Sequence, residues 1–177
     1  DVRLVDENGC DVPAGQPGEL WVSSPFVMYG YLDDPISTAE VLTDGWYHTG
    51  DVFRQDERGL YFFLDRISAM IKTGGENVYP NEVESVLRKH PSVMDCAVFS
   101  VPDPKWGEAV AAALVPEDGS IDLRDVHAFA KENLAGYRKP QYYIVLSELP
   151  KTASGKTDRR ALKESNSCTL TSIKELE

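Results

Sequence analysis

The amino-acid sequence predicts an α+β fold, in which a mostly β first part precedes a part that mixes helices with strands. Before residue 64, short alternating runs of apolar and polar residues are separated by turn residues, as in antiparallel strands. After residue 77, two segments place apolar residues on one stripe of a helix, and apolar strand-like runs lie between them. We therefore predict a boundary between Leu64 and Asp65.

In the first part, polar turns separate the expected strands, and Pro35 opens a short helix because proline is tolerated in a first turn. The run from Asp1 to Asp6 already alternates like a strand, and no initiator Met precedes it. We therefore expect the chain to be a piece of a longer protein. The expected strands are residues 1–6, 18–23, 47–53 and 59–64, and the expected helix covers residues 36–42.

Residues 64–77 join the two parts. Ile67, Ala69 and Ile71 fall on one side of an alternating run, which then breaks at Gly74-Gly75. A strand that enters a tight turn has this pattern, so a hairpin is expected after a short Asp-Arg linker. A glycine pair alone does not distinguish a functional turn from a structural one.

Two amphipathic helices are expected in the second part. The first begins at Pro80 and stops before Pro91, and the second is capped by Asp122 and ended by Gly136. Their apolar stripes consist of Val83, Val86 and Leu87 in the first helix and Leu123, Val126, Ala130 and Leu134 in the second.

Further strands, an exposed polar loop and a last helix complete the second part. Residues 165–177 show no persuasive pattern and are expected to be a tail. The expected strands are residues 93–101, 109–115 and 142–146, the loop covers residues 151–156, and the last helix begins at about residue 158.

The net charge and the distribution of basic residues limit the ligands that the chain could bind. The formal net charge of −11 over 177 residues argues against non-specific binding to nucleic acid or to an anionic membrane. An anionic ligand would need a local basic patch, and the stretch from residue 138 to 163 holds seven basic residues against two acidic ones. This cluster is either a solvated helix start or an anion site. Its members are Arg138, Lys139, Lys151, Lys156, Arg159, Arg160 and Lys163.

Cysteine and histidine patterns point to a reducing compartment and to no metal site built by the protein. Cys10, Cys96 and Cys168 form no CxxC pair, and the three histidines are scattered. The longest apolar run, residues 109–115, is too short to span a bilayer, and nothing near Asp1 resembles a signal peptide. We predict a cytoplasmic protein without a transmembrane segment.

Short motifs indicate where chemistry could occur. Asp51 follows a glycine at a strand bend, where a carboxylate could accept hydrogen bonds from a ribose diol or could simply stabilise a turn. Gly155-Lys156-Thr157 is not a phosphate-binding P-loop, because Pro150 stands where that motif needs glycine. Lys156 on an exposed loop could instead stabilise negative charge in a transition state, although most such lysines only face solvent.

Together, these motifs resemble those of the AMP-forming adenylating enzymes, which comprise acyl-CoA synthetases, aryl-CoA ligases, peptide-synthetase adenylation domains and beetle luciferases. The resemblance extends from about Asp1 to Lys163. The form Gly-Gly-Glu-Asn-Val-Tyr-Pro and the segment of residues 103–108 are most similar to fatty acyl- or aryl-CoA ligases. The matching segments are residues 18–20, 30–31, 47–51, 65–66, 71–84 and 149–156.

The resemblance implies a reaction in two halves. A fatty or aromatic carboxylate attacks the α-phosphate of ATP to give an acyl-adenylate and pyrophosphate, and the thiol of CoA then displaces AMP to give a thioester. Between the halves a small C-terminal α+β domain rotates. By this resemblance, residues 65–164 are that mobile domain, residues 1–64 end the large N-terminal domain, and residues 165–177 are the tail.

The same resemblance implies roles for the nucleotide-binding and adenylating residues. Asp51 would hold the ribose hydroxyls of ATP, and Arg66 would reach the same nucleotide. Lys156 would bridge the carboxylate and the α-phosphate during adenylation.

For the thioester half, the resemblance implies that the face carrying Lys72, Gly74 and Gly75 turns toward the active site. Glycine suits a place where the pantetheine arm of CoA passes close to the backbone. By position, Ser68 is the hinge residue, although the family more often has Asp or Lys there.

The family's phosphate loop, its adenine and acyl pockets and its magnesium-binding glutamate have no counterpart in this sequence. Mg²⁺ is therefore expected to be held mainly by an N-terminal part, and the chain alone is expected to be inactive. Two alternatives stay open: a peptide-synthetase-type adenylation domain, and a non-catalytic module that binds nucleotide or CoA.

Overall fold

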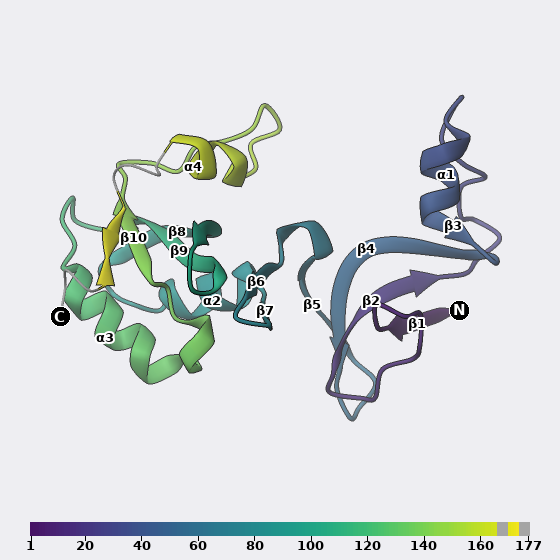
Figure 1. The fold of residues 1–177 in the computed structure, drawn as a ribbon, viewed down its shortest axis with the longest axis horizontal. Helices are drawn as coiled ribbons and strands as arrows, with labels where there is room; N and C mark the ends of the chain where they lie inside the picture. Colours follow the sequence, from purple (N-terminus) through teal and green to yellow (C-terminus); the bar gives the residue numbers. More distant parts are fainter. Residues whose placement is uncertain (166–169, 174–177) are drawn as a thin grey trace. The chain divides into compact units, whose positions relative to one another are not determined.

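The computed structural model describes residues 1–165 and 170–173 and divides the chain into two compact units, Asp1–Ser68 and Ala69–Glu177 (Figure 1). Each unit contains a sheet and at least one helix, which confirms the predicted α+β class. This division follows Ser68, inside the short 3₁₀ turn Ile67–Ala69, whereas the boundary expected from the sequence lies between Leu64 and Asp65.

An antiparallel sheet forms the first unit. Its strand order is β1-β2-β4-β3, and β5 pairs with β4. Helix α1 begins at Pro35, where the Asp34 side chain accepts a hydrogen bond from the Ser37 N–H at 2.9 Å and so caps the helix. The elements are β1 (Val2–Val5), β2 (Pro17–Val22), α1 (Pro35–Val41), β3 (Leu42–Thr43), β4 (Trp46–Gln55) and β5 (Tyr61–Arg66).

The predicted hairpin forms, but it begins later than expected. Ile67–Ala69 is a 3₁₀ turn, η1, and not the start of a strand. Ile67 is 43% exposed, whereas Ile71 is 1% exposed. Within the described part of the chain, β6 (Ile71–Thr73) pairs with β7 (Glu76–Val78) and β9 (Gly107–Pro116), and residues 67–69 pair with no strand. Alternation without a neighbouring strand was not sufficient to form a strand over residues 67–69.

The second unit is a mixed sheet with the order β11-β10-β9-β6-β7, and β8 pairs with β9. Strand β10 runs parallel to β9, and the other pairings are antiparallel. The elements are β8 (Val93–Asp103), β9 (Gly107–Pro116), β10 (Tyr142–Val145), β11 (Thr171–Ser172), α2 (Pro80–Leu87), α3 (Leu123–Asn133), η2 (Gly136–Arg138) and α4 (Arg159–Ser165).

Helices cover both faces of this sheet. Because successive strand residues point to opposite faces, Val98 of β8 packs in one core cluster and Phe99 packs in the other. The first cluster includes Val83 of α2 and Val126 of α3, and the second includes Leu162 of α4. Figure 1 shows α3 and α4 on opposite sides of the strands.

Two local features of the second unit differ from the sequence-based expectation. Helix α3 ends at Asn133, and Gly136 begins the short turn η2 and does not cap the helix. Within the expected tail, Thr171–Ser172 pairs with β10, and the Ile173 N–H donates to the Gln141 carbonyl at 3.0 Å. A two-residue strand has no periodicity to detect. The rest of the tail beyond Ser165, with Cys168, lies largely outside the described residues.

The two cysteines that the structure describes differ in burial and should therefore differ in reactivity. Cys96 is 1% exposed, and burial raises the pKa of its thiol to about 12, whereas Cys10 is exposed. The raised pKa leaves less of the Cys96 thiol as thiolate, which is the reacting form. We expect iodoacetamide to label Cys10 in the folded chain and to leave Cys96 unlabelled until denaturant is added, as followed by peptide mass spectrometry. Labelling of Cys96 at the rate of Cys10 would contradict this expectation.

Candidate active site

The structure brings together the two residues predicted to bind the nucleotide. Asp51 of β4 and Arg66 of β5 stand opposite each other in the strand register, and the Arg66 Nε lies 2.7 Å from the Asp51 Oδ1. The Asp51 side chain is 28% exposed and the Arg66 side chain is 63% exposed. A carboxylate and a guanidinium thus share one accessible place on the first unit.

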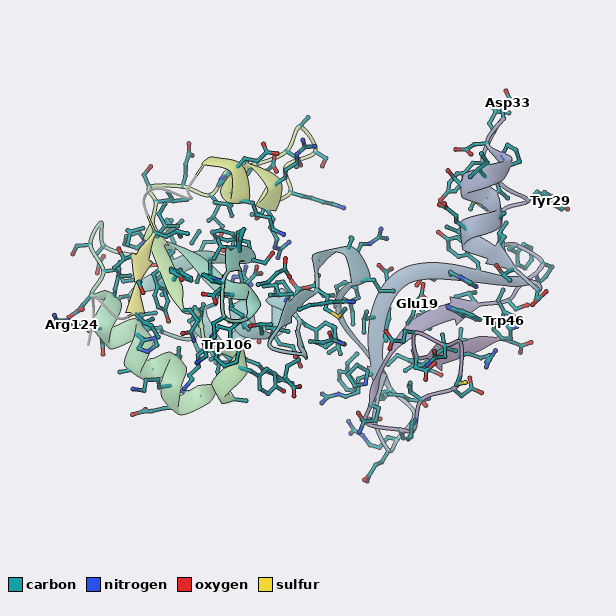
Figure 2. All side chains as sticks on the ribbon, in the orientation of Figure 1. Glu19, Tyr29, Asp33, Trp46, Trp106 and Arg124 are labelled. Carbon is teal, nitrogen blue, oxygen red and sulfur yellow. The ribbon has the colours of Figure 1, made fainter. Side chains whose placement is uncertain are left out.

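Strand β2 holds the bend that carries Asp51. Gly50 has φ +68°, and its N–H donates to the Glu19 Oε1 at 2.9 Å, while the Trp21 Nε1 donates to the Glu19 Oε2 at 2.9 Å. The Thr49 hydroxyl accepts from the Asp51 N–H at 3.1 Å and donates to a β2 carbonyl at 2.7 Å. Glu19, labelled in Figure 2, is a supporting residue to which the sequence assigned no role.

A glycine turn between β6 and β7 carries the residues predicted to face CoA. Gly74 and Gly75 have φ +58° and +86°, as the turn of a tight hairpin requires. The Gly74 N–H donates to the Trp106 carbonyl at 3.0 Å, and a Cβ atom added at Gly74 would lie 2.7 Å from the Trp106 Cε3. Lys72 is exposed, and its N–H donates to the Glu108 carboxylate at 3.0 Å.

A pocket of about 320 Å³ adjoins the glycine turn. Two half-exposed aromatic side chains, Trp106 and Tyr137, contribute to its lining, and the Lys105 Nζ lies 4.3 Å from the centroid of the Trp106 ring. Trp106 lies in the segment 103–108 that resembles the family, but no role was predicted for it, although a tryptophan in a loop of Pro, Asp, Lys, Gly and Glu was a detectable signal. The lining residues are Thr73, Gly74, Glu76, Trp106, Val110, Gly136, Tyr137 and Gln141.

Lys156 lies on a closed loop between β10 and α4. The Thr152 N–H donates to the Lys156 carbonyl at 2.8 Å, and the Gly155 N–H donates to the Thr152 carbonyl at 2.9 Å. At the base of the loop, the Asp158 N–H donates to the Pro150 carbonyl at 2.7 Å. The Lys156 side chain is exposed and has no ion-pair partner among the described residues. Its ammonium group is therefore available to an anionic ligand.

The basic cluster divides into paired arginines and unpaired lysines. Its arginines are held in ion pairs, Arg138 with Glu82 at 3.4 Å, Arg159 with Glu84 at 2.7 Å and Arg160 with Glu164 at 2.7 Å. Within residues 1–165 and 170–173, the cluster's lysines have no such partner; they are Lys139, Lys151, Lys156 and Lys163.

The expected site residues fall into separate groups. Asp51 and Arg66 belong to the first unit, and Ser68, the expected hinge, is the last residue of that unit. Lys72, the glycine turn and Lys156 belong to the second unit. No group of three or more His, Cys, Asp or Glu side chains in the described part of the chain could hold a metal ion. No described helix is both long enough and apolar enough to cross a membrane.

Comparison with known proteins finds a matching domain family and several similar proteins. Residues 82–156 match the AMP-binding enzyme C-terminal domain. The chain is 50% identical over 157 residues to a feruloyl-CoA synthase of an Amycolatopsis species, covering 88% of this chain and 32% of that protein. It is 44% identical over 164 residues to a long-chain-fatty-acid–CoA ligase of Yersinia pestis, covering 93% and 29%. The chain thus spans about a third of the length of these curated relatives.

Solved structures agree with these relatives. The amide bond synthetase McbA of Marinactinospora thermotolerans superposes with a TM-score of 0.86 at 40% identity, covering 92% of this chain and 34% of that one. The o-succinylbenzoate CoA synthetase of Bacillus subtilis, in complex with its acyl-adenylate intermediate, gives a TM-score of 0.85 at 36% identity, covering 93% and 34%.

Proposed function

The chain belongs to the family of AMP-forming adenylating enzymes, and we propose that it forms the C-terminal part of an ATP-dependent acyl-CoA ligase. In the first half-reaction, a carboxylate oxygen bonds to the α-phosphorus of ATP, and pyrophosphate leaves. In the second, the sulfur of CoA bonds to the acyl carbon, the thiol proton is lost, and AMP leaves. The products are a thioester, AMP and pyrophosphate.

The observation that carries this proposal is the exposed Lys156, which has no ion-pair partner among the described residues and lies on a loop closed by backbone hydrogen bonds. Negative charge accumulates on the α-phosphate as the carboxylate attacks, and a positioned ammonium group stabilises it. The first unit adds Asp51, whose carboxylate suits the two hydroxyls of ribose, and Arg66 beside it.

The pocket beside the glycine turn suits the second half-reaction. Its aromatic walls and the missing side chain at Gly74 favour a narrow, extended ligand such as the pantetheine arm of CoA. Lys72 adds a cation on the strand that leads into the turn. In this proposal Ser68 is the hinge between the two half-reactions.

The acid is proposed to be fatty or aromatic, because the relatives include ligases of both kinds. We also propose that the protein acts in the cytoplasm. Mg²⁺ would accompany the phosphates of ATP and would be held mainly by other parts of the protein. The chain by itself is proposed to be inactive.

The test uses the full-length protein that contains this chain. We expect ATP–pyrophosphate exchange that depends on an added carboxylic acid, drawn from a panel of fatty and aromatic acids, and a thioester when CoA is added. Exchange without transfer to CoA, but with transfer to a carrier protein, would support the peptide-synthetase alternative. Nucleotide or CoA binding without exchange for any acid would support the binding-module alternative.

Asp51 should control affinity for ATP. We expect Asp51→Ala to raise the KM for ATP roughly 10- to 150-fold, because hydrogen bonds to a charged group contribute about 1.5–3 kcal/mol. The measurement is pyrophosphate exchange at varied ATP and saturating acid. Glu57→Ala, which removes an exposed carboxylate from the turn between β4 and β5, is the matched control. An unchanged KM in Asp51→Ala would leave Asp51 as a turn residue only.

A further inference from the structure

Glu84 of α2 is a carboxylate buried in the second unit. It is 3% exposed, and its Oε1 accepts from the Val98 N–H at 2.8 Å and from the Arg159 Nη2 at 2.7 Å. Its Oε2 accepts from the Arg88 Nη2 at 3.1 Å. A buried charge is costly unless it is paired and hydrogen-bonded, so this carboxylate depends on its partners from α4, β8 and the end of α2.

Glu84 and Arg159 together occupy the free edge of strand β8. Within the described residues β8 pairs only with β9. The Val98 N–H donates to Glu84, and the Val98 carbonyl accepts from the Arg159 Nε at 3.1 Å. The two side chains thus satisfy backbone groups that a neighbouring strand would otherwise satisfy. Helix α4 is fixed to the sheet at its first residue.

This anchor lies three residues after Lys156. Between them, the Asp158 side chain accepts from the Ala161 N–H at 3.0 Å, and the Asp158 N–H closes the base of the loop. Leu162, in the next turn of α4, is fully buried. Because the Lys156 side chain has no ion-pair partner among the described residues, the position of its ammonium group depends on how firmly this loop is held.

The glycine turn is held by different contacts. Its hydrogen bonds run from Lys72 to Glu108 and from Gly74 to Trp106, and none of them includes Glu84 or Arg159. Loss of the Glu84–Arg159 pair should therefore affect the loop that carries Lys156 and leave the glycine turn unchanged.

We propose that the Glu84–Arg159 ion pair positions Lys156 and that the adenylation half-reaction, but not thioester formation, depends on it. The inference rests on the function proposed above. Arg159 is a positioning residue, since it acts through the loop and not on the substrate. A small displacement of a charge-stabilising group lowers a rate strongly, by roughly 10²-fold for 1 Å.

The test measures the two half-reactions separately in the full-length protein. Arg159→Met removes both hydrogen bonds and keeps most of the side-chain volume. We expect it to lower the kcat of pyrophosphate exchange by roughly 10- to 100-fold, and to leave thioester formation from a synthetic acyl-adenylate and CoA within about twofold. Arg159→Lys, which keeps the charge beside Glu84, should recover part of the loss.

Arg160→Met is the matched control, because Arg160 neighbours Arg159 but pairs only with the exposed Glu164 in the described part of the chain. It should leave both half-reactions unchanged. Equal losses in both half-reactions in Arg159→Met, or no loss in either, would overturn the proposal. If a thermal unfolding measurement shows that Arg159→Met is not folded, Arg159→Lys must show the selective loss of pyrophosphate exchange instead. Its absence in Arg159→Lys would then overturn the proposal.

Failure of the positioning role is distinguishable from failure of the function. If the wild-type protein shows no acid-dependent exchange, the proposed function fails. If the wild-type protein exchanges, Lys156→Ala does not, and Arg159→Met exchanges normally, only the positioning role fails.

Discussion

Replacing Lys156 by alanine is expected to lower carboxylate-dependent pyrophosphate exchange by about 10²–10³-fold, the loss typical for one charge-stabilising group in a transition state. The ammonium group is exposed and has no ion-pair partner in the described part of the chain, so its removal breaks no ion pair of the described fold. The loss should therefore appear in kcat without a matching loss of thermal stability. The measurement is exchange in the full-length protein at saturating acid and ATP.

Thioester formation separates this role from a general loss of activity. When a synthetic acyl-adenylate and CoA are supplied, Lys156→Ala should form the thioester within about twofold of the wild-type rate, because the proposed rotation about Ser68 moves Lys156 away from the active site before the sulfur attacks the acyl carbon. A parallel loss in both half-reactions would exclude the proposed division of labour.

Lys163→Ala is the control for the charge of the basic cluster. Lys163 is exposed, belongs to the same cluster and lies on α4 without a described ion pair. If its removal slows exchange as much as Lys156→Ala does, the cluster attracts anions as a whole, and Lys156 has no special position.

The sequence predicted those elements in which the spacing of apolar residues reflects burial on one or both faces. The apolar stripe of α2 and the alternating runs of β8 and β9 reflect burial on one or both faces, and the structure confirms these elements. Residues 67–69 alternate equally well, yet they form η1, because no strand pairs with them in the described structure. Strand pairing is a property of two segments, and one segment cannot reveal it.

The same limit applies to the candidate site. Sequence motifs named Asp51, Arg66, Lys72 and Lys156, and the structure describes where each one lies, while their roles stay predictions. The supporting contacts were not predictable, because they join distant positions: Arg159 reaches Glu84 across 75 residues, and Gly50 reaches Glu19 across 31. A buried carboxylate also cannot be recognised from the apolar stripe of a helix, because a charged residue such as Glu84 is expected to face solvent.

A side chain at Gly74 is expected to impair thioester formation selectively. Gly74 has φ +58°, and an added Cβ would lie 2.7 Å from the Trp106 Cε3. Alanine there would carry about 1–2 kcal/mol of backbone strain and would displace the indole, which lines the pocket beside the turn. We expect Gly74→Ala to lower the rate of thioester formation from acyl-adenylate and CoA by roughly 10- to 100-fold, with pyrophosphate exchange within about threefold.

Gly119→Ala is the control for backbone strain alone. Gly119 also has a positive φ, +75°, but a Cβ there would meet no atom within 4 Å. It should cost similar stability and leave thioester formation unchanged. A selective loss in Gly74→Ala and none in Gly119→Ala would then assign the defect to the displaced indole.

The double variant Gly74→Ala/Trp106→Ala distinguishes a blocked pocket from a lost wall. If the indole only obstructs the CoA arm when it is displaced, its removal should restore much of the rate lost in Gly74→Ala. If the indole also contacts the arm, Trp106→Ala alone should raise the KM for CoA, and the double variant should stay slow. Equal loss of exchange and thioester formation in Gly74→Ala would contradict both interpretations, because the glycine turn would then support the fold of the second unit and not the passage of CoA.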